Sequence, residues 1–172
     1  MDIEGLKTTV VEFVRLHQAW APFVVAALAF GESLAVISLF VPATVLLLAI
    51  GGLIGGAGLP FWPIWLGAAL GASFGDWLSY EVGRYLEDRA HHVWPLNRYP
   101  QMIRKGEDFT RKYGVWAIFL GRFFGPARAF VPLAAGVFEM PRGPFQVANV
   151  TSALIWAFLM LAPGTGLTRW VL

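Results

Sequence analysis

The chain has 172 residues, of which 57% are hydrophobic and only 14% are charged. Soluble domains carry about 25% charged residues, so this composition excludes an ordinary soluble protein and favours a membrane protein. The net charge of +2 comes without a basic, aromatic groove, which excludes a nucleic-acid partner, and the lack of cysteine excludes disulfides and thiolate metal sites.

Residues 1–20 place apolar side chains at near-helical spacing, which predicts an amphipathic helix lying on the membrane surface. The segment opens with Asp2 and Glu4 instead of basic residues, so we expect no cleavable signal peptide. No linker-like stretch follows, and residues 1–172 are expected to form a single membrane domain.

Residues 21–59 are apolar apart from one charge, Glu32. The stretch is too long for one span of about 20 residues and too short for two spans joined by a polar turn. Gly31, Pro42 and a glycine-rich run at 51–58 interrupt it, which indicates two half-helices that enter the membrane and return on the same side. We therefore expect a re-entrant hairpin over 21–59.

Residues 61–85 have the length of a full membrane span. A stripe of glycines four residues apart predicts the close approach of another helix, and consists of Gly67, Gly71 and Gly75. A polar stripe at helical spacing indicates a face turned toward the protein interior, and consists of Ser73, Asp76, Tyr80 and Arg84.

Residues 86–112 are polar and charged, and we expect them to face the cytoplasm. Seven of the thirteen lysines and arginines fall between residues 84 and 112, and such an excess of basic residues is typical of cytoplasmic loops. His91 and His92 lie in this segment without a carboxylate or cysteine at ligand spacing, so no metal site is expected.

Residues 113–140 repeat the interrupted apolar pattern and carry Arg122 and Arg128, which predicts a second re-entrant hairpin. The expected breaks in this hairpin are Gly121, Pro126, Pro132 and Gly136. Residues 144–168 are again long enough to span, and one face of this segment carries Gln146, Asn149, Ser152 and Trp156.

The two interrupted segments align with each other at an offset of ninety residues. The alignment places Glu32 on Arg122 and Pro42 on Pro132, so each charge stands ten residues before a proline. Corresponding interrupted segments in two halves of a chain indicate inverted repeats with a transport site at their interface. In such an arrangement Glu32 and Arg122 would lie at a similar depth and face each other.

Four charges lie inside the apolar segments: Glu32, Asp76, Arg122 and Arg128. Each costs about 2.5–3.5 kcal/mol at the centre of a bilayer, so we expect them to face one another or a wet cavity. Guanidinium groups donate in a forked geometry to phosphate oxygens, which makes both arginines candidates for binding a substrate phosphate. The alternative is that they pair with the carboxylates and hold the hairpins together.

The carboxylates have two possible roles, as proton- or cation-responsive groups or as permanent counter-ions. Asp76 has a further local alternative, because Tyr80 and Arg84 lie on its own stripe at helical spacing. The residues expected to support the site from the polar faces are Tyr80, Arg84, Asn149 and Trp156.

Two motifs resemble the DedA family of bacterial inner-membrane proteins, which is related to eukaryotic VTT-domain (SNARE-associated-type) scramblases. The motifs are Phe-Leu-Gly-Arg-Phe-Phe-Gly-Pro-Ala-Arg at 119–128 and Gly-Asp-Trp-Leu-Ser-Tyr-Glu-Val-Gly-Arg at 75–84. The resemblance implies an all-α fold of two re-entrant helical hairpins and transmembrane helices in inverted repeats, with essential charges at Glu32, Arg122 and Arg128. Many members carry an acid just after the proline of the first hairpin, whereas this chain has Ala43 and Thr44.

The resemblance also implies a flippase or scramblase that moves undecaprenyl phosphate or a phospholipid across the inner membrane. The alternative is a proton- or ion-coupled transporter of a small solute that uses the same cavity, with a proton or sodium ion as partner. An intramembrane phosphatase ranks last because no histidine falls in a predicted span, so we expect neither an enzyme nor a cofactor. The sequence leaves open the lipid, the ion coupling and the oligomeric state, a homodimer included.

Overall fold

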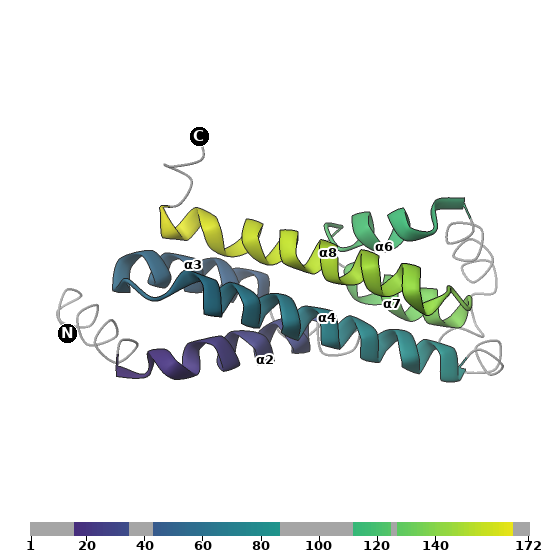
Figure 1. Ribbon diagram of the computed structural model, residues 1–172, viewed down its shortest axis with the longest axis horizontal. Helices are drawn as coiled ribbons and strands as arrows, with labels where there is room; N and C mark the ends of the chain where they lie inside the picture. Colours follow the sequence, from purple (N-terminus) through teal and green to yellow (C-terminus); the bar gives the residue numbers. More distant parts are fainter. Residues whose placement is uncertain (1–15, 35–42, 87–111, 125–126, 167–172) are drawn as a thin grey trace.

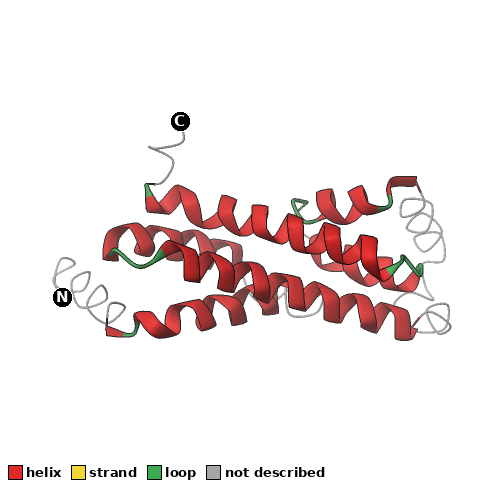
Figure 2. Cartoon of the chain, in the orientation of Figure 1, coloured by secondary structure: helices red, strands yellow, loops and turns green. Residues whose placement is uncertain are grey.

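The computed structural model describes residues 16–34, 43–86, 112–124 and 127–166. Regular structure in these residues consists of helices without a strand, which confirms the all-α prediction (Figure 2). The elements are η1 (Gln18–Trp20), α2 (Ala21–Ser33), α3 (Ala43–Ala57), α4 (Phe61–Leu86), α6 (Val115–Gly121), α7 (Ala127–Val137), α8 (Arg142–Leu161) and η5 (Ala162–Thr165). The surface helix expected over 1–20 and the polar segment 86–112 lie almost entirely outside the described residues.

The helices α4 and α8 run along the length of the molecule, and the shorter helices lie beside them in two pairs (Figure 1). The pair α2 and α3 lies toward the end where α4 begins, and the pair α6 and α7 lies toward the end where it finishes. The long helices are antiparallel, because Trp65 donates to the carbonyl of Leu154 at 3.0 Å near one end, and Arg142 donates to Glu81 at 3.0 Å near the other.

Glycines set the separation of the packed helices. A Cβ atom on Gly71 would overlap the carbonyl oxygen of Ala26, and one on Gly67 would overlap that of Pro22. The predicted glycine stripe of residues 61–85 is therefore confirmed as the contact surface of α4, with α2 as its neighbour. A Cβ atom on Gly136 of α7 would likewise overlap the carbonyl oxygen of Tyr80, on the other half of α4.

Three of the expected hairpin breaks do not interrupt a helix. Gly31 lies inside α2, where a glycine costs only about 1 kcal/mol. Pro132 lies inside α7, since helices of membrane proteins tolerate a proline when neighbouring groups satisfy the freed backbone carbonyl. Gly136 also lies inside α7, where it permits the contact with α4. Gly121 does end α6, while Pro42 and Pro126 lie outside the described residues.

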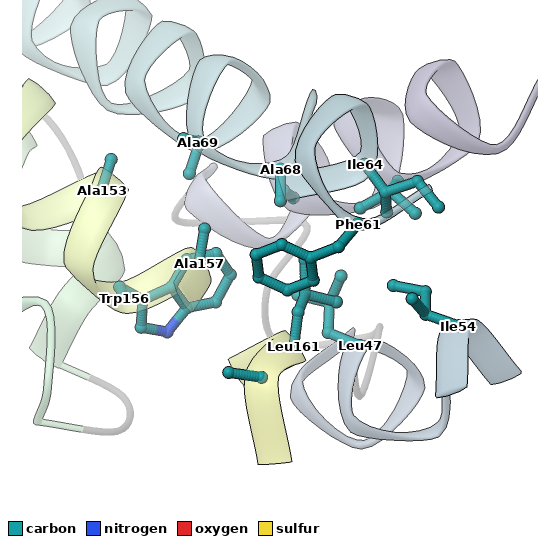
Figure 3. Close-up of a cluster of buried hydrophobic side chains, with 14 of the residues drawn as sticks. Leu47, Ile54, Phe61, Ile64, Ala68, Ala69, Ala153, Trp156, Ala157 and Leu161 are labelled. Carbon is teal, nitrogen blue, oxygen red and sulfur yellow. The ribbon is translucent and has the colours of Figure 1, made fainter. Parts of the chain in front are cut away.

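A polar layer separates two apolar clusters along the long helices. On α4, Ala72 belongs to the first cluster and Tyr80 to the second, with Asp76 between them. On the antiparallel helix α8, Phe145 near the start belongs to the second cluster and Trp156 near the end belongs to the first. Figure 3 shows the first cluster, in which side chains of α3, α4 and α8 point toward one another. The buried charges therefore lie part-way along the molecule, with apolar packing on both sides.

The helices α4 and α8 coincide closely with the segments 61–85 and 144–168, and their crossing of a membrane stays a prediction. The helix α4 has 26 residues and closely matches the span expected over 61–85. Among the described helices, the continuous stretch Arg142–Thr165, which has 24 residues, is the one that is both long and apolar enough to cross a membrane. It begins two residues before the span expected over 144–168.

The glycine contacts predict a position-specific stability effect. Gly71→Ala should destabilise the protein by about 1–3 kcal/mol, because the added methyl group forces α2 away from α4. Gly52→Ala is the matched control, since a Cβ at that position on α3 meets nothing within 4 Å. Thermal unfolding in detergent micelles measures both, and equal effects of the two variants would contradict this account of the helix contact.

Candidate functional site: two buried ion pairs

Two ion pairs occupy the polar layer and connect helices that are distant in the sequence. Arg122, which directly follows α6, donates through Nη2 to Oδ2 of Asp76 on α4. Arg128, the second residue of α7, donates through Nη1 to Oε1 of Glu32 on α2 at 2.7 Å. All four side chains are buried, and they are the buried charged residues of the described part of the chain.

This pairing differs from the one suggested by the alignment of the interrupted segments. Glu32 and Arg122 occupy corresponding places near the ends of α2 and α6, but the structure pairs Glu32 with Arg128 and Arg122 with Asp76. The four charges do come together as expected, and the two arginines balance the two carboxylates.

The guanidinium group of Arg122 is held mainly by α8. Its Nε donates to the hydroxyl of Ser152 at 2.9 Å, and its Nη2 also donates to the side-chain oxygen of Asn149 at 2.6 Å. The amide nitrogen of Asn149 in turn donates to the carbonyl of Ser73 at 2.9 Å. Both Asn149 and Ser152 are fully buried, so this network fixes the position of the arginine within the layer.

Arg128 is held by α2 and by an aromatic ring. Its Nη2 donates to the hydroxyl of Ser33 at 3.4 Å, and its guanidinium carbon lies 4.3 Å from the centre of the Trp156 ring. A desolvated contact of this type stabilises an arginine by about 2 kcal/mol. Trp156 therefore belongs to the site, as the polar face of residues 144–168 predicted.

Tyr80 and Arg84 do not join the site. The hydroxyl of Tyr80 donates to the carbonyl of Met140, and Nη1 of Arg84 donates to that same hydroxyl at 3.2 Å. Asp76 therefore pairs with Arg122, and not with Tyr80 or Arg84 of its own helix as the local alternative predicted. Sequence reasoning missed Ser33 and Ser79, which connect α2 to α4 through a 3.4 Å bond from the Ser79 hydroxyl to the Ser33 carbonyl.

One donor of the cluster remains unused. Nη1 of Arg122 is buried and has no hydrogen-bond partner among the described residues. Since buried donors are nearly always satisfied, this nitrogen calls for an acceptor beyond those that the structure describes. Across the described ranges, no three His, Cys, Asp or Glu side chains gather as a metal site requires.

A family model described as the VTT domain matches residues 41–166, which include Asp76, Arg122 and Arg128. The chain belongs to the DedA family. This DedA protein is 33% identical over 152 residues to the inner membrane protein YabI of Escherichia coli, an alignment that covers 88% of this chain and 60% of that protein.

Other relatives of this DedA protein are also named as membrane proteins. It is 28% identical over 159 residues to the uncharacterized membrane protein BU139 of Buchnera aphidicola, covering 92% of this chain and 62% of that one. It is 29% identical over 147 residues to the Escherichia coli inner membrane protein YghB, covering 85% and 67%. The chain thus spans about 60% of the length of the first of these relatives. No solved structure matches this DedA protein significantly.

Because both ion pairs are buried, removing one partner should be costly. Asp76→Asn should destabilise the protein by about 3–5 kcal/mol, since it leaves the guanidinium group of Arg122 without a counter-charge. The double variant Asp76→Asn/Arg122→Gln should recover most of that loss, as measured by thermal unfolding in micelles. The control is Glu81→Gln, whose partner Arg142 is exposed, so little change is expected. A double variant as unstable as Asp76→Asn alone would contradict the pairing.

Proposed function

We propose that this DedA protein is a membrane lipid transporter, a flippase or scramblase, that moves an anionic lipid phosphate across the bacterial inner membrane. The lipid is undecaprenyl phosphate or a phospholipid. The observation that carries this proposal is the cluster of two arginines and two carboxylates buried between apolar layers. Ionisable groups inside a membrane protein are rare and typically line the pathway of a substrate or ion.

Phosphate binding at this cluster is an exchange of partners. Each arginine already has a carboxylate, so a lipid phosphate takes the place of a carboxylate oxygen as the acceptor of the guanidinium donors. The displaced Asp76 or Glu32 then keeps the site balanced by taking up a proton or a cation. This exchange gives the carboxylates the responsive role and makes a proton or sodium ion a second partner.

The arrangement of the helices supports a topology of two membrane spans and two re-entrant hairpins. In the proposal α4 and α8 cross the bilayer, while α2–α3 and α6–α7 are re-entrant hairpins that enter from opposite sides as inverted repeats. The two pairs lie toward opposite ends of the long helices, which such a topology requires (Figure 1). The polar segment 86–112 would be cytoplasmic, and the ion pairs would lie near the middle of the bilayer.

Single cysteines test this topology, because the natural chain has none. Lys112→Cys and Glu139→Cys flank the second hairpin and should both be protected from a membrane-impermeant thiol reagent added outside intact cells. Pro60→Cys, in the turn between α3 and α4, should be labelled from outside. Opposite labelling of residues 112 and 139 would mean that 113–140 crosses the bilayer, and the re-entrant hairpin would be wrong.

Two double variants test the transport proposal, because each replaces one buried ion pair with uncharged side chains. Asp76→Asn/Arg122→Gln should insert normally but flip a fluorescent lipid phosphate in liposomes at least about tenfold more slowly, because the charge-assisted bonds to the phosphate are lost. Arg128→Gln/Glu32→Gln should show the same loss. Arg142→Gln removes an exposed arginine outside the cluster and should transport like the natural chain. Unchanged flipping by both double variants would show that the charges only hold the helices together.

The equal number of arginines and carboxylates also supports the alternative, a proton- or ion-coupled transporter of a small anionic solute. The same liposomes distinguish the two. A lipid transporter flips the labelled lipid without releasing trapped soluble phosphate esters, whereas a solute transporter releases the esters and leaves the lipid in place.

A further inference from the structure

Ser33, the last residue of α2, is fully buried and packs against the turn of α4 that carries Asp76. A Cβ atom on Gly75, the residue before Asp76, would lie 2.7 Å from the Cβ atom of Ser33. On the next turn of α4, the hydroxyl of Ser79 donates to the carbonyl of Ser33 at 3.4 Å. These two contacts hold Ser33 at the part of α4 from which Asp76 extends.

The hydroxyl of Ser33 is shared by the two ion pairs. A hydroxyl accepts hydrogen bonds through its lone pairs and donates one proton, so it can serve two partners at once. It accepts a hydrogen bond at 3.4 Å from Nη2 of Arg128, whose counter-ion is Glu32. It also forms a side-chain hydrogen bond with the carboxylate of Asp76, whose counter-ion is Arg122. One chain of hydrogen bonds therefore joins the four buried charges through a neutral side chain.

We propose that Ser33 is a positioning residue that couples the two ion pairs, so that a change in one pair alters the stability of the other. Hydrogen bonds in such a chain polarise one another, and each depends on the state of its neighbours. The other contacts that the structure describes for Arg122 and Arg128 share no side chain. The coupling is a property of the cluster before any substrate binds, so it goes beyond the proposed function and does not depend on it.

A double-mutant cycle between the two pairs tests this coupling in the full chain. One arm is Asp76→Asn/Arg122→Gln, the other is Glu32→Gln/Arg128→Gln, and the combined variant carries both. Equilibrium unfolding in micelles measures how far each variant lowers the folding equilibrium constant. With Ser33 present, the combined loss should differ by about fivefold or more from the product of the separate losses, because groups in one network are not additive. In the Ser33→Ala background the two should agree within about twofold, as they do for independent sites.

Ser79→Ala is the matched control. It also removes a buried hydroxyl from the contact between α2 and α4, but it leaves the hydroxyl of Ser33 in place. This variant should lower stability while the coupling keeps its natural value. A merely structural Ser33 would behave in the same way, so equal coupling in the Ser33→Ala and natural chains would overturn the proposal. Additive losses in the natural chain would overturn it too, as would a Ser79→Ala chain that loses the coupling.

If the combined variant does not fold, a fluorine label reports the coupling with fewer substitutions. Fluorotryptophan is incorporated, and the NMR signal of Trp156, whose ring centre lies 4.3 Å from the guanidinium carbon of Arg128, is assigned with Trp156→Phe. Asp76→Asn/Arg122→Gln should shift this signal, and the shift should be clearly smaller in the Ser33→Ala background. Equal shifts would overturn the proposal. Neither measurement uses a lipid, so a failure here leaves the transport proposal standing, and a failure of lipid flipping leaves the coupling standing.

Discussion

A guanidinium group removed from water is stable only beside a counter-charge and enough acceptors for its donors, and this requirement organises the centre of the molecule. Arg122 and Asp76 are 46 residues apart, and Arg128 and Glu32 are 96 apart. Neither pair can form until α4 meets the end of α6 and α2 meets the start of α7. The ion pairs therefore specify which helices become neighbours, while van der Waals packing at the small-residue contacts holds those helices together.

Close helix packing makes these pairs possible. Glycine on α4 brings the backbone of α2 into contact, so that a short side chain such as Ser79 reaches the carbonyl of Ser33. Gly136 brings α7 against the other half of α4 and sets the position from which Arg128 extends. Apolar clusters on both sides keep the layer dry, which strengthens each electrostatic contact and raises the cost of any missing partner.

The sequence predicted the parts of the fold that depend on composition and periodicity. The glycine stripe of 61–85 identified the face of α4 that packs on α2, and the polar stripe identified the face that carries Asp76. The four members of the cluster were identified because each is a charged residue in an apolar segment. The partner of each charge could not be predicted, because pairing depends on the relative positions of four helices. Ser33 gave no signal of its own, since a serine at a helix end is common, and Pro132 was misread because a proline can remain inside a helix.

The two arginines differ in a way that matters for any anion that reaches them. A cluster of two cations and two anions is neutral, so it can remain in an apolar layer without substrate, whereas two unpaired arginines could not. An arriving phosphate adds a negative charge, and the cluster stays balanced only when a carboxylate is protonated or meets a cation. In the proposed exchange, Arg122 would bind the phosphate first, because its Nη1 has no hydrogen-bond acceptor among the residues that the structure describes. In the proposed cycle, substrate entry would be coupled to the charge state of Asp76 or Glu32, because this chain has Ala43 and Thr44 where many DedA proteins carry an acid after the first-hairpin proline.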